Sequence, residues 1–389
     1  RIQEAYPEIL EGTSGKYMNW ETVDPEKWAP HGYVCIRIDS RGAGNSEGCI
    51  DFWSKQEAKD LYECIEWAAV QPWSNGKVGL LGISYYAVNQ WAVAAMQPPH
   101  LVAICPFEGC NDAYRDMARH GGILCDFVPL WQPIQVSGVQ HGLGSRGKVS
   151  RINGMRVSGD VDLSEEELAS KSVNVKEDFL KHDLADEYYL NHSTDLSKVT
   201  VPVLSCGNWG GNACHLRGNV EGYMRAGSTE KFLEIHGLEH FTEFYTDYGR
   251  KMQKAFFDHY LKGEDTWHQA PVHLRLRNVD GTFQDVDEQE WPIARTQWTK
   301  FYPNTSDMTL SEEPGEGGDI SFEAMGDWLT FMTRPLKEDM VIAGPLTAKL
   351  FIKSTTEDAD IFITVRVLDP EGKDVTFVSA NDAHGVVGT

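Results

Sequence analysis

The sequence predicts an α/β fold built on a parallel sheet, followed by a second, β-rich domain. Three observations support this prediction. Strand-like and helix-like segments alternate over the first hundred residues, a polar stretch then interrupts them, and period-two patterning replaces them after Gly263. A length of 389 residues is enough for two domains, each with its own core.

The first region alternates short apolar runs with amphipathic segments. Residues 33–38, 78–81 and 101–105 are typical of strands, and residues 55–70 carry an apolar stripe at helical spacing. A second helix is expected over 85–96, because two prolines follow it. Strands separated by helices and short loops indicate a parallel sheet with right-handed crossovers.

The next region departs from this rhythm and then returns to it. Residues from 110 to about 195 are rich in charge and glycine, so we interpret them as an insertion into the first domain. Strands are expected again at 201–204 and 232–235, and a helix over 251–261 closes the domain. The first domain is thus predicted to span residues 1–265.

The remaining residues, 266–389, read as an antiparallel β-domain. Residues 272–277 alternate strictly, and residues 348–353 and 360–368 form two further runs separated by polar residues. These runs predict a β-sandwich. We expect it to be incomplete, because no final strand is evident near residue 389.

Charge and cysteine usage restrict the class of protein. Fifty-eight acidic against 35 basic side chains give a net charge of −23, which opposes broad contact with nucleic acid or an anionic membrane. The eight cysteines are scattered without a C-x-x-C pair, which favours reduced thiols in a cytoplasmic protein over a disulfide framework. Arg1 is not an initiator, so we expect a fragment whose targeting segment, if any, lies upstream.

The strongest chemical signal is the sequence Gly-Ile-Ser-Tyr-Tyr-Ala at residues 82–87, between a predicted strand and a predicted helix. This context is typical of a nucleophile elbow, in which a sharp turn exposes the serine hydroxyl. Ser84 is therefore the candidate nucleophile, and the next N–H, that of Tyr85, is a candidate oxyanion donor. The usual second glycine is Tyr86 here, and the small residue is Ala87. The alternative is that Ser84 only caps an ordinary helix.

A serine nucleophile requires a base, and His240 follows the predicted strand 232–235. His236 and His240 also match the H-x-x-E-H spacing of a zinc peptidase. That chemistry requires both histidines on one helix, and Gly237 argues against a helix here. We therefore expect no metal and no cofactor.

The acid that would orient His240 is not identified by the sequence. The loop after strand 201–204 contains no carboxylate over residues 205–215, where the acid is expected. Asn208 or Asn212 could orient the histidine without supplying charge. Three carboxylates outside that loop remain open as substitutes: Glu239, Glu243 and Asp112.

Together these features resemble the cocaine-esterase and X-Pro dipeptidyl-peptidase-like α/β-hydrolases, the CocE/NonD type. The resemblance rests on residues 39–46, 67–73, 82–87, 201–204 with Trp209, His240 and 256–263. It implies an α/β-hydrolase core whose first strands lie upstream of this chain, a helical cap inserted at about 110–195, and a C-terminal jelly-roll sandwich. It also implies Ser84 as nucleophile, His240 as base and the Tyr85 N–H as oxyanion donor. Two departures follow: Gly211 stands where the family has its aspartate, and the family's oxyanion tyrosine would lie upstream.

The sequence therefore predicts a serine hydrolase that cleaves a small-molecule ester or amide through an acyl-enzyme. Phe107, Phe127 and Trp131 suggest an apolar acyl pocket. The missing aspartate leaves an alternative, a protein of the same fold that binds a ligand or catalyses a lactonisation or cyclisation. A homodimer is compatible with the sequence, and no nucleic-acid or membrane partner is expected.

Overall fold

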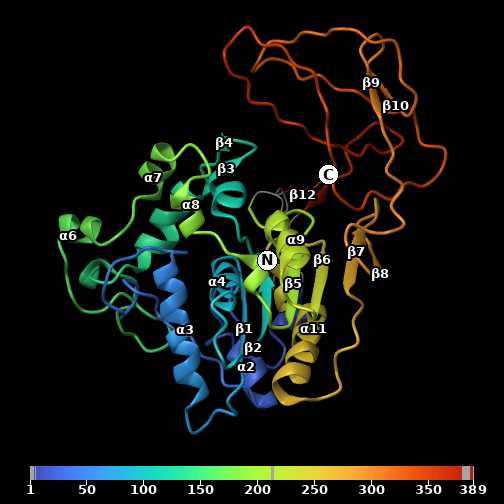
Figure 1. The fold of residues 1–389 in the computed structure, drawn as a ribbon. Helices are drawn as coiled ribbons and strands as arrows, with labels where there is room; N and C mark the ends of the chain where they lie inside the picture. Colours follow the sequence, from blue (N-terminus) through green and yellow to red (C-terminus); the bar gives the residue numbers. More distant parts are fainter. Residues whose placement is uncertain (1–3, 5, 212–213, 379–385, 389) are drawn as a thin grey trace.

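A six-stranded sheet forms the centre of the computed structural model, which describes residues 4, 6–211, 214–378 and 386–388 (Figure 1). Its order is β1-β2-β5-β6-β7-β8; the first five strands run parallel, and β8 is antiparallel to β7. The strands are β1 (Val78–Ile83), β2 (Leu101–Phe107), β5 (Val203–Asn208), β6 (Lys231–His236), β7 (Val272–Arg277) and β8 (Phe283–Glu288).

Helices cover both faces of this sheet. The long helices are α3 (Lys55–Ala69), α4 (Tyr85–Ala94), α9 (Leu216–Arg225) and α11 (Asp247–Phe257). On one face Ile65 and Trp91 pack against Ile104, and on the other Phe256 packs in a cluster with Cys105. The two β2 residues point to opposite faces because successive side chains alternate along a strand. The predicted parallel sheet with covering helices is confirmed.

Local sequence explains why these helices begin where they do. The side chain of Ser54 accepts the N–H of Glu57 at 3.3 Å and so caps α3. The hydroxyl of Thr246 does the same for α11, accepting the N–H of Gly249 at 3.4 Å. Both helices then turn an apolar stripe toward the sheet, as their sequence periodicity predicts.

The insertion consists of short elements that pack around a core shared with Ile50 and with Val88 of α4. Phe179 and Tyr189 are buried there with Met117. The elements are β3 (Arg119–His120), β4 (Ile123–Leu124), α5 (Phe127–Trp131), α6 (Glu165–Ser170), α7 (Val175–Lys181) and α8 (Glu187–Asn191). They gather beside α3 and α4 in Figure 1.

The other short elements connect these parts or lie in the C-terminal region. They are η1 (Pro7–Ile9), α2 (Pro25–Trp28), η2 (Ala29–His31), η3 (Ala113–Ala118), η4 (Gln132–Val136), η5 (Ser137–Val139), η6 (Gly144–Arg146), η7 (Leu196–Lys198), α10 (Thr242–Tyr245), η8 (Asp258–Lys262), β9 (Tyr302–Asn304), β10 (Thr309–Ser311), β11 (Phe377–Val378) and β12 (Val386–Gly388). No helix within the described ranges is both long and apolar enough to cross a membrane. The thiols of all eight cysteines are unpaired.

Two sequence predictions about strands are wrong. Residues 33–38 are extended, and Tyr33 and Cys35 pack toward the core, but they pair with no strand. Residues 348–353 and 360–368 are likewise outside hydrogen-bonded strands, and Phe351 is 94% exposed. Alternation selects a face, whereas a strand also needs a hydrogen-bonding neighbour. Among the described residues such pairing is found at the end of the last run, where Leu368 bridges Asp374 and the carbonyl of Val367 accepts the N–H of Val375 at 2.9 Å.

The third correction concerns residues 272–277. They form a strand, as predicted, but this strand is β7, which pairs with β6 in the central sheet instead of belonging to a separate one. The domain boundary at residues 265 and 266 stays a prediction.

Candidate active site

Ser84 lies at a sharp turn between β1 and α4. Its backbone has φ 58° and ψ −114°, and its N–H donates to the carbonyl of Phe107 at 3.0 Å. A Cβ at Gly82 would lie 2.5 Å from the Cβ of Tyr86, so glycine is required there. The Ser84 side chain does not cap α4, which removes the helix-cap interpretation. Within the described part of the chain its hydroxyl makes no hydrogen bond and remains available for chemistry.

His240 lies in the loop between β6 and α10, and Glu21 links it to the Ser84 turn. The Nε2 atom of His240 is 3.0 Å from Oε1 of Glu21. The carbonyl of Glu21 in turn accepts the N–H of Ile83, the residue before Ser84, at 3.1 Å. The structure thus brings both predicted residues to one region, with Nε2 of His240 on Glu21 and not on the Ser84 hydroxyl.

A second histidine packs against the first. The ring of His215 stacks on that of His240, with centroids 4.8 Å apart and planes 22° apart. Burial, together with the nearby charge of His240, lowers the pKa of His215 well below its ordinary value. His215 therefore contributes a neutral ring that limits where the His240 imidazole can lie.

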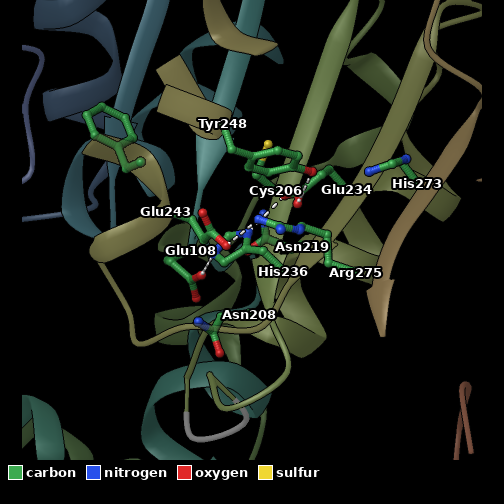
Figure 2. Close-up of polar contacts among 12 residues, drawn as sticks. Glu108, Cys206, Asn208, Asn219, Glu234, His236, Glu243, Tyr248, His273 and Arg275 are labelled. Carbon is green, nitrogen blue, oxygen red and sulfur yellow. Dashed lines mark hydrogen bonds and ion pairs between the residues drawn. The ribbon is translucent and has the colours of Figure 1, made fainter. Parts of the chain in front are cut away.

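Behind His240 lies a buried chain of charged groups, shown in Figure 2. His236 places Nε2 3.0 Å from Oε1 of Glu108 and Nδ1 2.8 Å from Oε2 of Glu234. The Tyr248 hydroxyl donates to Oε1 of Glu234 at 2.9 Å. Burial alone would lower the pKa of His236, but the charge of Glu234 and the contact with Glu108 raise it to about 10. His236 is therefore a buried cation between two carboxylates.

Glu108 is the residue that the sequence analysis missed. It follows β2 directly, has φ 50°, is fully buried, and donates its N–H to the Cys206 carbonyl at 2.8 Å. Its Oε2 atom is 4.0 Å from Nδ1 of His240. The available signal was positional: Glu108 follows a buried strand next to the elbow strand, and carboxyl ends of parallel strands meet at one edge.

Two of the three acids considered from the sequence are engaged elsewhere. Asp112 caps η3 and pairs with Arg115 at 2.9 Å, and Glu243 pairs with Arg275 at 2.7 Å. Asn208 is buried, and its Oδ1 accepts the N–H of Gly210 at 2.6 Å. Glu239 is buried in the His240 loop, and Asn212 lies outside the described residues.

The zinc alternative conflicts with this geometry. His236 ends β6, and residues 237–239 are not helical, so His236 and His240 do not share a helix face. Both ring nitrogens of His236 already face carboxylates. Across the residues that the structure describes, no group of three or more His, Cys, Asp or Glu side chains could hold a metal ion.

The helix N-terminus after Ser84 leaves the N–H of Tyr85 without an intrahelical acceptor, as an oxyanion donor requires. The hydroxyl of Tyr85 donates a hydrogen bond to Glu57. The Tyr85 ring lies 5.9 Å from the ring of Trp131, and Trp131 stacks on Trp53 at 5.5 Å. Of the other predicted pocket residues, Phe107 is buried in the core and Phe127 is 45% exposed.

A cavity of about 470 Å³ lies on the insertion side of the site. Three of its lining residues are arginines, and a fourth is Cys214, the neighbour of His215. Arg217 pairs with the buried Asp116 at 2.5 Å, and Arg119 donates to the carbonyl of Phe179 at 3.0 Å. The cavity therefore carries arginine side chains that are held in place by neighbouring groups.

Two sequence models of protein families match this chain. Residues 5–242 match the sequence model of the X-Pro dipeptidyl-peptidase family S15, and residues 266–386 match that of its C-terminal non-catalytic domain. The cocaine esterase of Rhodococcus sp. is 24% identical over 88% of this chain and 71% of its own.

Solved structures show the same fold. A CocE/NonD family hydrolase from Staphylococcus aureus is 32% identical with a TM-score of 0.67, covering 79% of this chain; the chain spans about half, 52%, of that protein. An α-amino acid ester hydrolase is 18% identical with a TM-score of 0.56, covering 80% of this chain and 58% of its own. The core is therefore of the α/β-hydrolase type, followed by a C-terminal region of the family's β-rich kind. The chain belongs to the X-Pro dipeptidyl-peptidase S15 family and is similar to hydrolases of the CocE/NonD type.

Proposed function

We propose that the protein cleaves a small-molecule ester or amide through an acyl-enzyme on Ser84. The Ser84 oxygen forms a bond to the substrate carbonyl carbon while Nε2 of His240 takes the hydroxyl proton. Collapse of the tetrahedral intermediate breaks the bond to the alcohol or amine, which leaves with that proton. Water then attacks the acyl-enzyme, with His240 again as base, and releases the acid.

The observation that carries this proposal is the backbone at Ser84. A residue at φ 58° with a Cβ is strained, and the structure maintains this conformation although the side chain caps nothing. Such a turn presents the hydroxyl at the carboxyl end of β1 beside the N-terminus of α4, where the Tyr85 N–H can stabilise an oxyanion. His240 contacts the same Glu21 that binds the turn.

One movement is required before reaction. Nε2 of His240 has to leave Glu21 and reach the Ser84 hydroxyl, because both positions call on the same nitrogen. Catalytic hydrogen bonds of this kind often form only when substrate is bound. The same acyl-enzyme would also support lactonisation or cyclisation, in which a substrate hydroxyl or amine replaces water.

The test combines covalent labelling with turnover. The full chain is treated with a fluorophosphonate probe and assayed on p-nitrophenyl esters of increasing acyl length. We expect one adduct on Ser84 and ester hydrolysis that Ser84→Ala abolishes. Ser74→Ala is the matched control, because the half-buried Ser74 precedes β1, at the opposite end of that strand from Ser84. A folded chain that takes up no probe, or a Ser84→Ala variant that still hydrolyses these esters, would refute the proposal.

A further inference from the structure

Two carboxylates approach His240 from opposite sides of its ring. Glu21 contacts Nε2 at 3.0 Å, and Glu108 lies 4.0 Å from Nδ1. In a serine triad, one ring nitrogen receives the serine proton and the other donates its N–H to the acid. The carbonyl of Glu21 binds the residue before Ser84, so Nε2 is on the side of the nucleophile. Nδ1 consequently faces the acid position, and the carboxylate there is Glu108.

The space around Gly211 is shaped for this carboxylate. A Cβ at residue 211 would lie 2.7 Å from Oε2 of Glu108, closer than real Cβ contacts allow. Gly211 is not at positive φ, so its lack of a side chain serves space and not backbone freedom. A larger residue at position 211 would displace the Glu108 carboxylate from its position near His240.

The buried chain gives Glu108 a fixed orientation and a compensating charge. Its Oε1 atom is 3.0 Å from Nε2 of His236, and Glu234 holds the opposite nitrogen of that ring. A carboxylate buried without a positive partner would be costly, and the buried cation at His236 provides that partner. Figure 2 shows the first of these contacts, between Glu108 and His236. The other Glu108 oxygen, Oε2, lies 4.0 Å from Nδ1 of His240.

We propose that Glu108 is the positioning carboxylate of the triad, supplied from the end of β2 into the space that Gly211 leaves open after β5. This inference rests on the proposed function of Ser84 and His240. The order along the chain is then nucleophile, acid and base, as in other α/β-hydrolases. Glu108 acts through His240: it holds the imidazole with Nε2 toward Ser84 and stabilises the imidazolium that forms when the serine proton is taken.

The experiment compares two isosteric variants of the full chain, Glu108→Gln and Glu21→Gln. They alter the carboxylates on opposite nitrogens of His240, so each is the control of the other. We expect Glu108→Gln to lower kcat for p-nitrophenyl esters by about 10³- to 10⁴-fold with KM changed little, because the acid is lost and substrate binding is not. Fluorophosphonate labelling of Ser84 should slow in parallel. Glu21→Gln should lose far less activity than Glu108→Gln, because Nε2 has to leave Glu21 before reaction in any case. The control expected to stay within about threefold of the parent is Glu177→Gln, an exposed carboxylate on α7.

Two further measurements distinguish positioning from a structural role. Because Glu108→Gln removes a negative charge beside the base, the acidic limb of kcat/KM should move to lower pH. The exchange variant Glu108→Gly with Gly211→Asp moves the carboxylate to the neighbouring loop. It should recover at least about 10²-fold over Glu108→Gly alone, and glycine suits the positive φ at residue 108. A merely structural role would show neither effect.

The outcomes separate the two proposals. If Ser84→Ala retains hydrolysis, the proposed function fails. If Ser84→Ala is inactive while folded Glu108→Gln keeps more than about a tenth of the activity, only the assignment of Glu108 is overturned. It is also overturned if Glu21→Gln shows the thousandfold loss instead. If Glu108→Gln does not fold, the exchange variant decides: recovery supports the assignment, and a folded, inactive exchange variant refutes it.

Discussion

Replacing Ser84 by glycine should stabilise the protein while it abolishes catalysis. Ser84 has φ 58° and ψ −114°, a conformation that costs a residue with a Cβ about 1–3 kcal/mol. Glycine adopts it freely but adds about 0.4–1 kcal/mol of entropy to the unfolded chain. The alanine variant keeps the Cβ and the strain. The difference predicts that Ser84→Gly unfolds with about 0.5–2 kcal/mol more free energy than Ser84→Ala.

Urea unfolding of both variants, followed by tryptophan fluorescence and circular dichroism, measures this difference. Both lack the nucleophile, so substrate or product cannot bias the comparison. The pair Gln97→Gly and Gln97→Ala calibrates the effect of glycine at positive φ away from the site, because the exposed Gln97 has φ 56° just after α4. A Ser84→Gly variant no more stable than Ser84→Ala would show that the turn stores no strain, and the argument that it is held for function would fall.

Three further predictions concern the ionisation of His236, the ionisation of Glu57 and the removal of metal. The pKa of His236 in the fold, about 10, exceeds its unfolded value of about 6.5, so its stabilising contribution is complete below pH 6.5 and is lost as pH rises through 10. The unfolding free-energy gap between the parent and His236→Gln should therefore narrow over that interval; a constant gap would contradict the buried cation. Burial raises the pKa of Glu57 to about 7 in the fold, above its unfolded value of about 4.5. The folded state therefore loses stability relative to the unfolded state as pH rises from 4.5 through 7 and Glu57 ionises. Over that range the free energy of unfolding of Glu57→Gln should rise by up to about 3 kcal/mol relative to the parent, less the contribution of the weakened hydrogen bond to Tyr85. Stability curves that stay parallel for the two proteins would refute this prediction. Prolonged dialysis against EDTA should leave ester hydrolysis unchanged, whereas loss of activity restored by zinc would reopen the metal interpretation of His240.

The Ser84 turn could be predicted because its determinants are local. An apolar strand, a glycine with no room for a side chain, a serine and a helix that ends before two prolines follow each other within about twenty residues, so the pattern and the structure coincide. His240 was predicted from its order along the chain and its place after a strand. The structure puts it beside Glu21, whose role no local pattern signals.

Glu108 could not be predicted in the same way, because its position depends on how strands pair. It comes close to His240 only because β2 lies between β1 and β5 and ends at the same edge. The sequence directed attention to residues 205–215, where a carboxylate was expected, and the structural counterpart is a glycine that makes room for one from the neighbouring strand. The same limit explains residues 33–38, which are extended as predicted but have no neighbouring strand among the described residues to pair with.

Strand β7 changes what a minimal catalytic fragment has to contain. It falls within the segment that matches the non-catalytic domain, yet it pairs with β6, and its Arg275 lies 4.1 Å from the ring of Tyr248 and pairs with Glu243. Cutting the chain after residue 265 would remove β7 and expose the unpaired backbone edge of β6. It would also leave the buried carboxylate of Glu243 without the positive charge of Arg275. An excised core intended for screening or crystallisation should therefore extend at least through Glu288, the end of β8.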